Sequence, residues 1–390
     1  MKFKGWKTQK AYIDIVGDGT EVIKRYIDCS DVDWEVNMSK KFKSRHSFEL
    51  QKVGHDSVRM PRFLMGLGTW VAGVDIERLR RALFSISVDD LCNQLDEILV
   101  DLKANNLKFN DIHPNNILFC EKTRTLKLTD FYWCNRSHLL DINKRYGTDD
   151  EKAIQKIKQE VRELGAIVEK EVAQMKSQFV NTVGKIYNDG SYVAPGVTYQ
   201  PIDIPGFEDV RFLKDICAYE YSVIKQHIPK GISTTTDIGC ANGFFTFNLI
   251  RDNNLNTATV YETDPAIVTL LWNIKLCFRL SNLVIKGTFD DKSEISSDVT
   301  IWMNNHMWID KEIGSDRCDV ATSNVFKNSK LTFFQTAGID SYGTALIEDL
   351  KNKEDVEQYI KSVGGNPEFL ETTTKHRGYR HLFKVRSNNG

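Results

Sequence analysis

Two short polar loops, each beside predicted strands, constrain the fold of this chain more than any other feature. The first is Phe-Asn-Asp-Ile-His-Pro-Asn-Asn at 109–116, and the second is Asp-Ile-Gly-Cys-Ala-Asn-Gly at 237–243. They lie in different halves of a 390-residue chain, and a domain usually contains about 100–200 residues. The sequence therefore predicts two domains, each large enough to bury its own core.

The first loop connects a predicted helix to a predicted hairpin. Residues 88–107 carry apolar side chains at the spacing of an amphipathic helix, and 117–129 form strand-like segments around a charged turn. This arrangement brings Asp111, Asn116 and Asp130 together at the ends of the hairpin. The first can orient or deprotonate an acceptor hydroxyl, and the other two can hold Mg²⁺ on nucleotide phosphates. A single Asp or Asn in a loop is more often a turn former, so the joint spacing carries this prediction.

The order helix, loop, hairpin and Asp130-Phe131 resembles the catalytic core of protein-kinase-like enzymes, and the spacing of Asp111 and Asn116 matches theirs. The resemblance implies a bilobal α+β domain that binds ATP and Mg²⁺. In that domain Asp111 is the catalytic residue, and Asn116 and Asp130 are the metal ligands. His113-Pro114 is more similar to small-molecule and sugar kinases than to peptide kinases.

A strand lysine extends this resemblance. Lys24, on the second strand of a predicted hairpin at 12–26, matches the lysine that contacts the nucleotide phosphates. Glu49 is the first candidate for its carboxylate partner on a helix, and Glu35 is the second. The family's glycine-rich loop is absent, and Tyr132 stands where the family has glycine. The alternative is a kinase-like scaffold without catalytic activity that presents a substrate to the second domain.

A segment rich in Lys and Glu separates the two loops. Residues 141–186 carry apolar side chains at helical spacing, which predicts one or two amphipathic helices that close the first domain. Helix breakers follow at 188–191 and 195–196. The predicted domains are therefore 1–186 and 187–390.

The second loop lies between a strand and a helix. Residues 234–238 are strand-like and 244–250 are helix-like, which is the geometry for holding a nucleoside-bearing ligand at a helix N-terminus. Gly239 and Gly243 let the backbone approach such a ligand. The next predicted strand ends at Glu262, whose carboxylate can accept both ribose hydroxyls. An NAD site is the alternative, although the glycine spacing differs from GxGxxG.

Residues 237–243 closely resemble the cofactor loop of Rossmann-like class I methyltransferases, and the likeness extends over residues 197–386. The resemblance implies an α/β domain that binds S-adenosylmethionine through this loop and the strand that follows it. The implied cofactor-binding residues are Asp237, Gly239, Cys240, Ala241, Gly243 and Glu262, with Asp290 as a candidate beside the adenine.

Residues 298–308 resemble the fourth strand of that fold and its active-site loop. Ligands in such sheets bind beyond the carboxyl ends of the strands, so Asn304, Asn305 and His306 are expected beside the transferred methyl group. His306 is either a general base or substrate ligand, or a hydrogen-bonded structural histidine. Tyr199 either packs on the cofactor or fills the core.

The two resemblances together predict a bifunctional enzyme that phosphorylates a hydroxyl and methylates the same or a related acceptor. The combination is similar to the bacterial kinase–methyltransferases that cap O-antigen polysaccharides, with the domains in reverse order, and it implies a glycan or small-molecule acceptor. The alternative is a methyltransferase of RNA, protein or glycan with a non-catalytic kinase-like module. A net charge of −1 provides no global basic field to attract nucleic acid.

Cysteine usage and hydropathy bear on the compartment. Eight cysteines without a CxxC pair predict neither a zinc site nor a disulfide framework, and they fit a reducing cytosol. The start of the sequence lacks the apolar run of a signal peptide, and no stretch approaches the ~18 apolar residues of a membrane span. A cytoplasmic protein without a membrane span is therefore expected.

Overall fold

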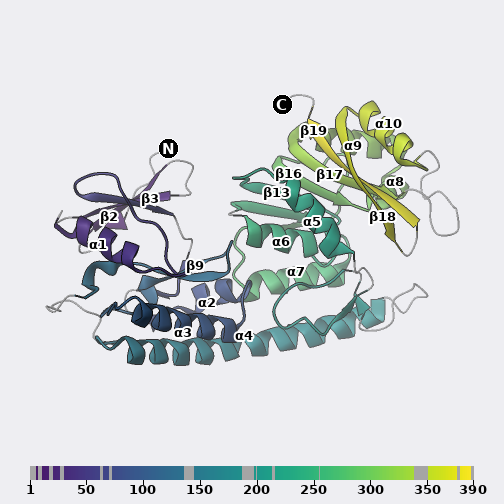
Figure 1. Cartoon of the computed structure of the whole chain (residues 1–390). Coiled ribbons are helices and arrows are strands. Elements are labelled where there is room, and N and C mark those ends of the chain that lie inside the picture. Colours follow the sequence, from purple (N-terminus) through teal and green to yellow (C-terminus); the bar gives the residue numbers. More distant parts are fainter. Residues whose placement is uncertain are drawn as a thin grey trace. The chain divides into compact units, whose positions relative to one another are not determined.

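The computed structural model describes residues 6–7, 11–16, 21–26, 30–61, 65–69, 73–135, 145–186, 197–198, 200–212, 216–253, 255–337, 350–375 and 378–387. Contacts between residues divide the chain into two compact units, Met1–Lys170 and Glu171–Gly390 (Figure 1). No helix within the described ranges has both the length and the apolar composition that crossing a membrane requires.

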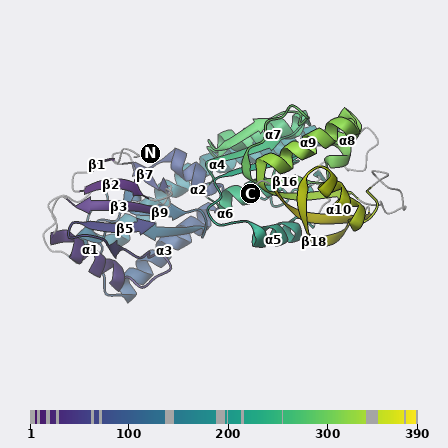
Figure 2. The same cartoon turned by 90° about the horizontal axis from the view of Figure 1, so that it is seen from above.

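The first unit begins with an antiparallel sheet in the order β1-β2-β3-β5-β4. Its strands are β1 (Trp6–Lys7), β2 (Ala11–Val16), β3 (Glu21–Tyr26), β4 (Gln51–Lys52) and β5 (Ser57–Pro61). The pairing of β2 with β3 confirms the predicted hairpin, whose turn lies outside the described residues. Helix α1 (Ser30–Lys41) packs beside this sheet (Figure 2) and buries Val32 and Val36 in a cluster with Tyr26 and Val58.

The rest of the first unit is mainly helical. Its elements are α2 (Ile76–Leu83), α3 (Val88–Ala104), the first part of α4 (Asp150–Ile186), β6 (Met65–Gly66), β7 (Gly68–Thr69), β8 (Gly73–Val74), β9 (Ile117–Cys120), β10 (Thr125–Leu128), and the 3-10 turns η1 (Pro114–Asn116) and η2 (Phe131–Trp133). Helix α3 buries the predicted apolar stripe and begins after Ser87, whose hydroxyl accepts the N–H of Asp90. The predicted hairpin is confirmed because β9 and β10 pair, with Ile117 opposite Leu128.

Helix α4 is one continuous helix of 37 residues, whereas the sequence predicts one or two helices. The two compact units divide inside it, after Lys170. Before the division, Lys158 forms an ion pair with Asp96 of α3. After the division, Lys176 lies 2.8 Å from the carboxylate of Asp209. The first part of α4 therefore forms an ion pair within the first unit, and the last part forms one within the second unit.

The second unit is built on a seven-stranded sheet in the order β15-β14-β13-β16-β17-β19-β18. The strands are β13 (Thr234–Ile238), β14 (Thr257–Tyr261), β15 (Leu283–Lys286), β16 (Ser297–Met303), β17 (Ser329–Ala337), β18 (Gly365–Lys375) and β19 (Gly378–Ser387). The first five in chain order are parallel and follow the doubly wound order 3-2-1-4-5. The last strand pairs antiparallel with both β17 and β18. This half therefore has the predicted Rossmann-like α/β architecture.

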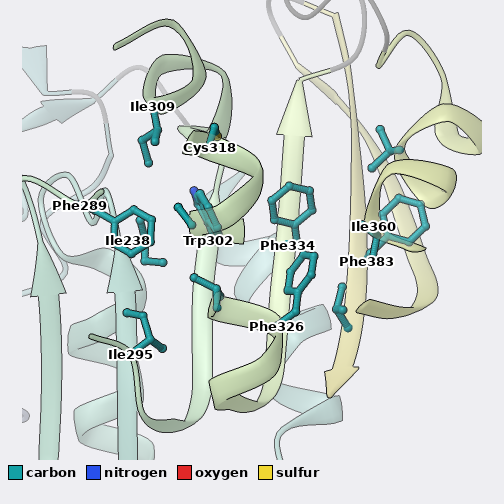
Figure 3. Packing of buried hydrophobic residues seen from close by; sticks show 14 of the residues in the cluster. Ile238, Phe289, Ile295, Trp302, Ile309, Cys318, Phe326, Phe334, Ile360 and Phe383 are labelled. Carbon is teal, nitrogen blue, oxygen red and sulfur yellow. The ribbon is translucent and has the colours of Figure 1, made fainter. Parts of the chain in front are cut away.

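Helices cover both faces of this sheet (Figure 1). One face carries α5 (Cys217–His227), α6 (Phe244–Asp252) and α7 (Pro265–Cys277), and the other carries α8 (His306–Ile313), α9 (Ser315–Asn328) and α10 (Lys353–Ser362). On the second face, Trp302, Phe334 and Phe383 of three neighbouring strands form a buried core with residues of α9 and α10 (Figure 3). A short parallel pair, β11 (Val197–Thr198) and β12 (Arg211–Phe212), precedes the sheet.

Candidate active sites

In the first unit, a lysine lies between two carboxylates from distant parts of the chain. The Nζ atom of Lys24, on β3, lies 3.1 and 3.3 Å from the two carboxylate oxygens of Glu35 on α1. The same atom lies 3.2 Å from Oδ1 of Asp130, which precedes η2. Glu35, the second of the two predicted candidates, is therefore the carboxylate partner. Glu49 is exposed in the segment after α1 and does not fill this role.

The charges of this cluster stabilise one another against burial. Burial alone lowers the pKa of Lys24, but Asp130 and Glu35 outweigh it and hold that pKa well above its ordinary value. Burial raises the pKa of Glu35, and Lys24 opposes that rise. The hydroxyl of Tyr26, two residues along β3, donates to Glu35 Oε2. The lysine therefore stays charged and is held in place from both sides.

The predicted loop residues meet at the ends of the hairpin β9–β10. The side-chain nitrogen of Asn116 donates to the carbonyl oxygen of Asp111 at 3.0 Å, and the N–H of Thr129 donates to the carbonyl oxygen of Asn116 at 2.9 Å. Asp130 follows directly, with a left-handed φ of 66°. The structure thus brings Asp111, Asn116 and Asp130 to one end of the hairpin and connects Asp130 to Lys24.

Asp150 supports this loop and was missed by sequence reasoning. Its carboxylate accepts the backbone N–H groups of Phe109 and Asn110 at 2.7 and 2.8 Å. Asn110 has a left-handed φ of 69°, a conformation that costs energy and persists where surrounding contacts impose it. Burial raises the pKa of Asp150, and the two N–H groups oppose that rise. The only signal in the sequence is an acidic residue in the first turn of a helix.

The predicted metal ligands of the first unit are the side-chain amide of Asn116 and the carboxylate of Asp130. Among the described residues, no group of three or more His, Cys, Asp and Glu side chains is arranged to hold a metal ion. The amide nitrogen of Asn116 is bound to the backbone of Asp111, so its amide oxygen is the atom that can face a metal. Oxygen is the ligand atom that Mg²⁺ prefers, and Asn116 with Asp130 fits that requirement when nucleotide phosphates supply the remaining ligands.

In the second unit, the loop after β13 is a turn that requires glycine. Gly239 has φ of 67°, Ala241 has 47° and Gly243 has 79°. A Cβ at Gly239 would lie 1.5 Å from Nδ2 of Asn305, so the carboxamide of Asn305 rests directly on the glycine backbone. Asp237, buried at the end of β13, accepts the hydroxyl of Thr246 on α6 at 2.6 Å. The predicted loop residues are therefore held in one tight turn at the carboxyl end of β13.

Cys240 and Glu262 lie in or against the turn. Burial is the main cause that raises the pKa of Cys240 well above its ordinary value, so its thiol stays neutral. Glu262, directly after β14, accepts the N–H of Ala241 at 2.9 Å through Oε2. Its Oε1 accepts the N–H groups of Thr263 and Asp264 at 2.7 and 3.0 Å. Because each carboxylate oxygen has two lone pairs, Oε1 is fully used and Oε2 retains one acceptor position, which suits one ribose hydroxyl and not both of those that the prediction assigns to Glu262.

His306 lies in the core behind the strand ends. Its ring packs against those of Trp302, Phe334 and Tyr359, with centroids 5.2–5.5 Å apart. Nε2 lies 2.9 Å from the hydroxyl of Tyr359 and 3.5 Å from Sγ of Cys318. Burial lowers the pKa of His306 to about 3. Of the two predicted roles, this neutral and enclosed environment favours the structural one.

Asp290 and Tyr199 are the remaining predicted positions of the second unit. Asp290 caps a turn, in which its Oδ1 accepts the hydroxyl of Ser293 at 2.9 Å and the N–H of Lys292 at 3.1 Å. Tyr199 lies outside the described residues. The sequence places its neighbour Gln200 in the same element over the cofactor pocket, and the carbonyl oxygen of Gln200 accepts the side-chain nitrogen of Asn242 in the glycine turn at 2.7 Å. The Oε1 atom of Gln200 is buried and has no hydrogen-bond partner among the described residues.

Comparisons with known proteins give only distant likenesses. No protein-family model and no curated protein matches the chain. Among solved structures, the bifunctional kinase–methyltransferase WbdD is 14% identical, with a TM-score of 0.40 over 54% of this chain and 46% of WbdD. The N-terminal domain of EvdMO1 with SAH bound is 10% identical, with a TM-score of 0.38 over 54% of this chain and 97% of that domain. The [4+2]-cyclase SpnF is 12% identical, with a TM-score of 0.37 over 55% of this chain and 93% of SpnF.

The matched region spans less than half of the whole chains of EvdMO1 and WbdD, at 43% and 46%. Likenesses with TM-scores of this size assign no activity, so we infer function from the geometry of the two sites.

Proposed function

We propose that the second unit is a methyltransferase that uses S-adenosylmethionine. The observation that carries this proposal is the contact between the glycine turn and the ends of two flanking strands. Glu262, after β14, is bound to the N–H of Ala241 inside the turn, and Asn305, after β16, rests on Gly239. In a doubly wound sheet this is the ligand-binding edge, and the fixed carboxylate suits a ribose.

The residues around this edge position the reactants. S-adenosylmethionine, when bound, supplies a methyl group on a positively charged sulfur. The glycine turn would let the backbone approach the cofactor, Glu262 would accept a ribose hydroxyl, and Asn304 and Asn305 would lie beside the transferred methyl group. Such a reaction depends mainly on alignment of the acceptor with the methyl group. We do not assign His306 the role of general base, because burial lowers its pKa to about 3 and a group with so low a pKa is a weak base.

We propose further that the first unit binds Mg²⁺–ATP and transfers a phosphoryl group. Support comes from Lys24, which is held within 3.3 Å of Glu35 and Asp130. A lysine–glutamate pair on a strand and a helix, with a metal-binding Asp nearby, is the arrangement that phosphoryl transfer in protein kinases requires. Asp111 would orient the acceptor hydroxyl, and Asn116 and Asp130 would hold the metal.

The acceptor is proposed from the sequence resemblance to be a glycan or small molecule with a free hydroxyl. Phosphorylation and methylation would then act on one acceptor or on related acceptors. The second candidate function is a methyltransferase whose first unit only binds the substrate, in which case Lys24, Glu35 and Asp130 form a structural ion cluster.

Titration calorimetry on the full-length chain separates these functions. We expect S-adenosylhomocysteine and Mg²⁺–ATP to bind independently. Glu262→Gln is expected to weaken only the first ligand and Lys24→Met only the second, so each variant is the folding control for the other. Binding of the nucleoside ligand without ATP binding supports the substrate-binding module. Failure of the wild-type chain to bind S-adenosylhomocysteine or S-adenosylmethionine contradicts the methyltransferase proposal.

A further inference from the structure

A line of hydrogen-bonded polar side chains runs through the buried interior of the second unit. Asn304 Nδ2 donates to Gln335 Oε1 at 2.6 Å, and Gln335 Nε2 donates to Thr373 Oγ1 at 3.2 Å. The Thr373 hydroxyl donates to Glu220 Oε1 at 3.4 Å. The exposed fraction of every member is 8% or less. Residues from β17, β18, α5 and the loop after β16 are therefore connected in one relay.

The donor at the far end fixes the direction of the whole relay. Thr373 has a single hydroxyl proton, which it donates to Glu220 Oε1. The oxygen of Thr373 then accepts from Gln335, and the amide oxygen of Gln335 accepts from Asn304. The orientation of an amide is otherwise ambiguous, but here it follows from Glu220. The remaining polar atom of Asn304, its Oδ1, is consequently an acceptor.

That acceptor lies at the ligand-binding edge and has no internal partner. Asn304 Oδ1 is buried without a hydrogen bond from any described residue. Asn304 follows the last residue of β16 and has a left-handed φ of 64°. The next residue, Asn305, rests on Gly239 of the glycine turn. A buried acceptor without a donor is costly, and strained backbone is concentrated at functional sites, so both features indicate that a ligand supplies the donor.

We propose that Asn304 Oδ1 accepts a hydrogen bond from the α-ammonium group of the methionine part of the cofactor, and that Glu220, Thr373 and Gln335 are the positioning residues for this contact. The inference rests on the proposed methyltransferase function. An acceptor oxygen repels the carboxylate of the cofactor and attracts its ammonium group. The ammonium group is also the charged donor of the cofactor, whereas a ribose hydroxyl is already assigned to Glu262.

The test compares two ligands that differ only in the ammonium group. Calorimetry on the full-length chain would use S-adenosylhomocysteine and its analogue with hydrogen in place of the α-amino group. Glu220→Gln keeps the shape but allows the relay to reverse, because a glutamine amide can donate to Thr373. Asn304 would then present its amide nitrogen to the ligand. Thr373→Val interrupts the relay without adding a donor. Thr336→Val, which removes a buried hydroxyl one residue beyond Gln335 on β17, is the matched control.

Both relay variants are expected to bind S-adenosylhomocysteine about 10- to 100-fold more weakly than wild type, the range for one hydrogen bond to a charged group. They are expected to bind the deaminated analogue as wild type does, and Thr336→Val is expected to bind both ligands normally. Unchanged affinity for S-adenosylhomocysteine in a folded relay variant overturns the inference, and so does an equal loss for both ligands. Should Glu220→Gln not fold, Thr373→Val decides the question. A wild-type chain that binds neither ligand instead overturns the proposed function.

Discussion

Replacing Gly239 with alanine is expected to disrupt the glycine turn through two separable costs. The residue has φ of 67°, and the added Cβ would lie 1.5 Å from Nδ2 of Asn305. A left-handed backbone costs a residue other than glycine about 1–2 kcal/mol, and forcing an extra carbon into a packed site costs about 1–3 kcal/mol. The sum of about 2–5 kcal/mol is below the stability of a typical domain, about 5–15 kcal/mol. The variant should therefore fold, with lower stability.

The same substitution is expected to weaken cofactor binding. Asn305 has to move away from the turn, or the turn has to move away from Asn305, and either movement changes the edge where the nucleoside is proposed to bind. Because about 1.4 kcal/mol corresponds to a tenfold change in affinity, we expect S-adenosylhomocysteine to bind at least about tenfold more weakly. Titration calorimetry and thermal unfolding of the full-length chain measure the two effects.

Two other glycines of the same unit separate backbone strain from steric conflict. Gly231 has φ of 79° with no described atom within 4 Å of an added Cβ, and Gly287 has neither a left-handed φ nor a close neighbour. Gly231→Ala is expected to lose only the stability that corresponds to the left-handed backbone, about 1–2 kcal/mol. Gly287→Ala is expected to lose almost no stability. If Gly239→Ala loses no more stability than Gly231→Ala and binds S-adenosylhomocysteine normally, the inferred contact with Asn305 is wrong.

Three further predictions concern buried charges. Lys24→Met leaves Glu35 buried without its cation, which should lower the stability of the first unit by about 3–5 kcal/mol at neutral pH. Because burial raises the pKa of Glu35, protonation of Glu35 at lower pH should reduce that loss of stability. Hydrogen exchange of β3 and α1 measures both effects. Asp150→Asn removes the anion that accepts the N–H groups of Phe109 and Asn110, and those two amides should exchange faster, while exchange in the glycine turn stays unchanged. Burial lowers the pKa of His306 from 6.5 to about 3, so the folded state resists protonation. The wild type should lose about 1.6 kcal/mol between pH 6.5 and 5, because the slope rises from half of 1.36 kcal/mol per pH unit to nearly all of it. His306→Gln should remove that part of the pH dependence of unfolding, and an unchanged pH profile would contradict the buried, neutral state of His306.

The sequence predicted several elements because their patterns are local. Helix α3 follows from the spacing of its leucines, and the hairpin β9–β10 follows from two strand-like segments around a charged turn. The glycine turn follows from residues that tolerate a left-handed backbone beside a strand. In each element the residues that interact are close in the sequence, so periodicity and turn chemistry were sufficient.

Other features depended on contacts between distant residues. Glu35 rather than Glu49 pairs with Lys24 because α1 directs that carboxylate into the interior, and the sequence did not fix where this helix begins and ends. Strand β18 and helix α10 were not predicted. The enclosure of His306 arises from the rings of Trp302, Phe334 and Tyr359, which come from three separate elements.

The sequence by itself determined which groups are available for chemistry: the Asp111 and Asn116 loop, Asp130, Lys24, and the glycine turn followed by Glu262. Only the tertiary structure decided how those groups are supported. It selected Glu35 and Asp150 as the carboxylates of the first unit, and it oriented Asn304 through Glu220. The physical reason is that hydrogen bonds and ion pairs act over about 3 Å in space, while the residues that form them are separated in the chain by between 11 and 153 positions.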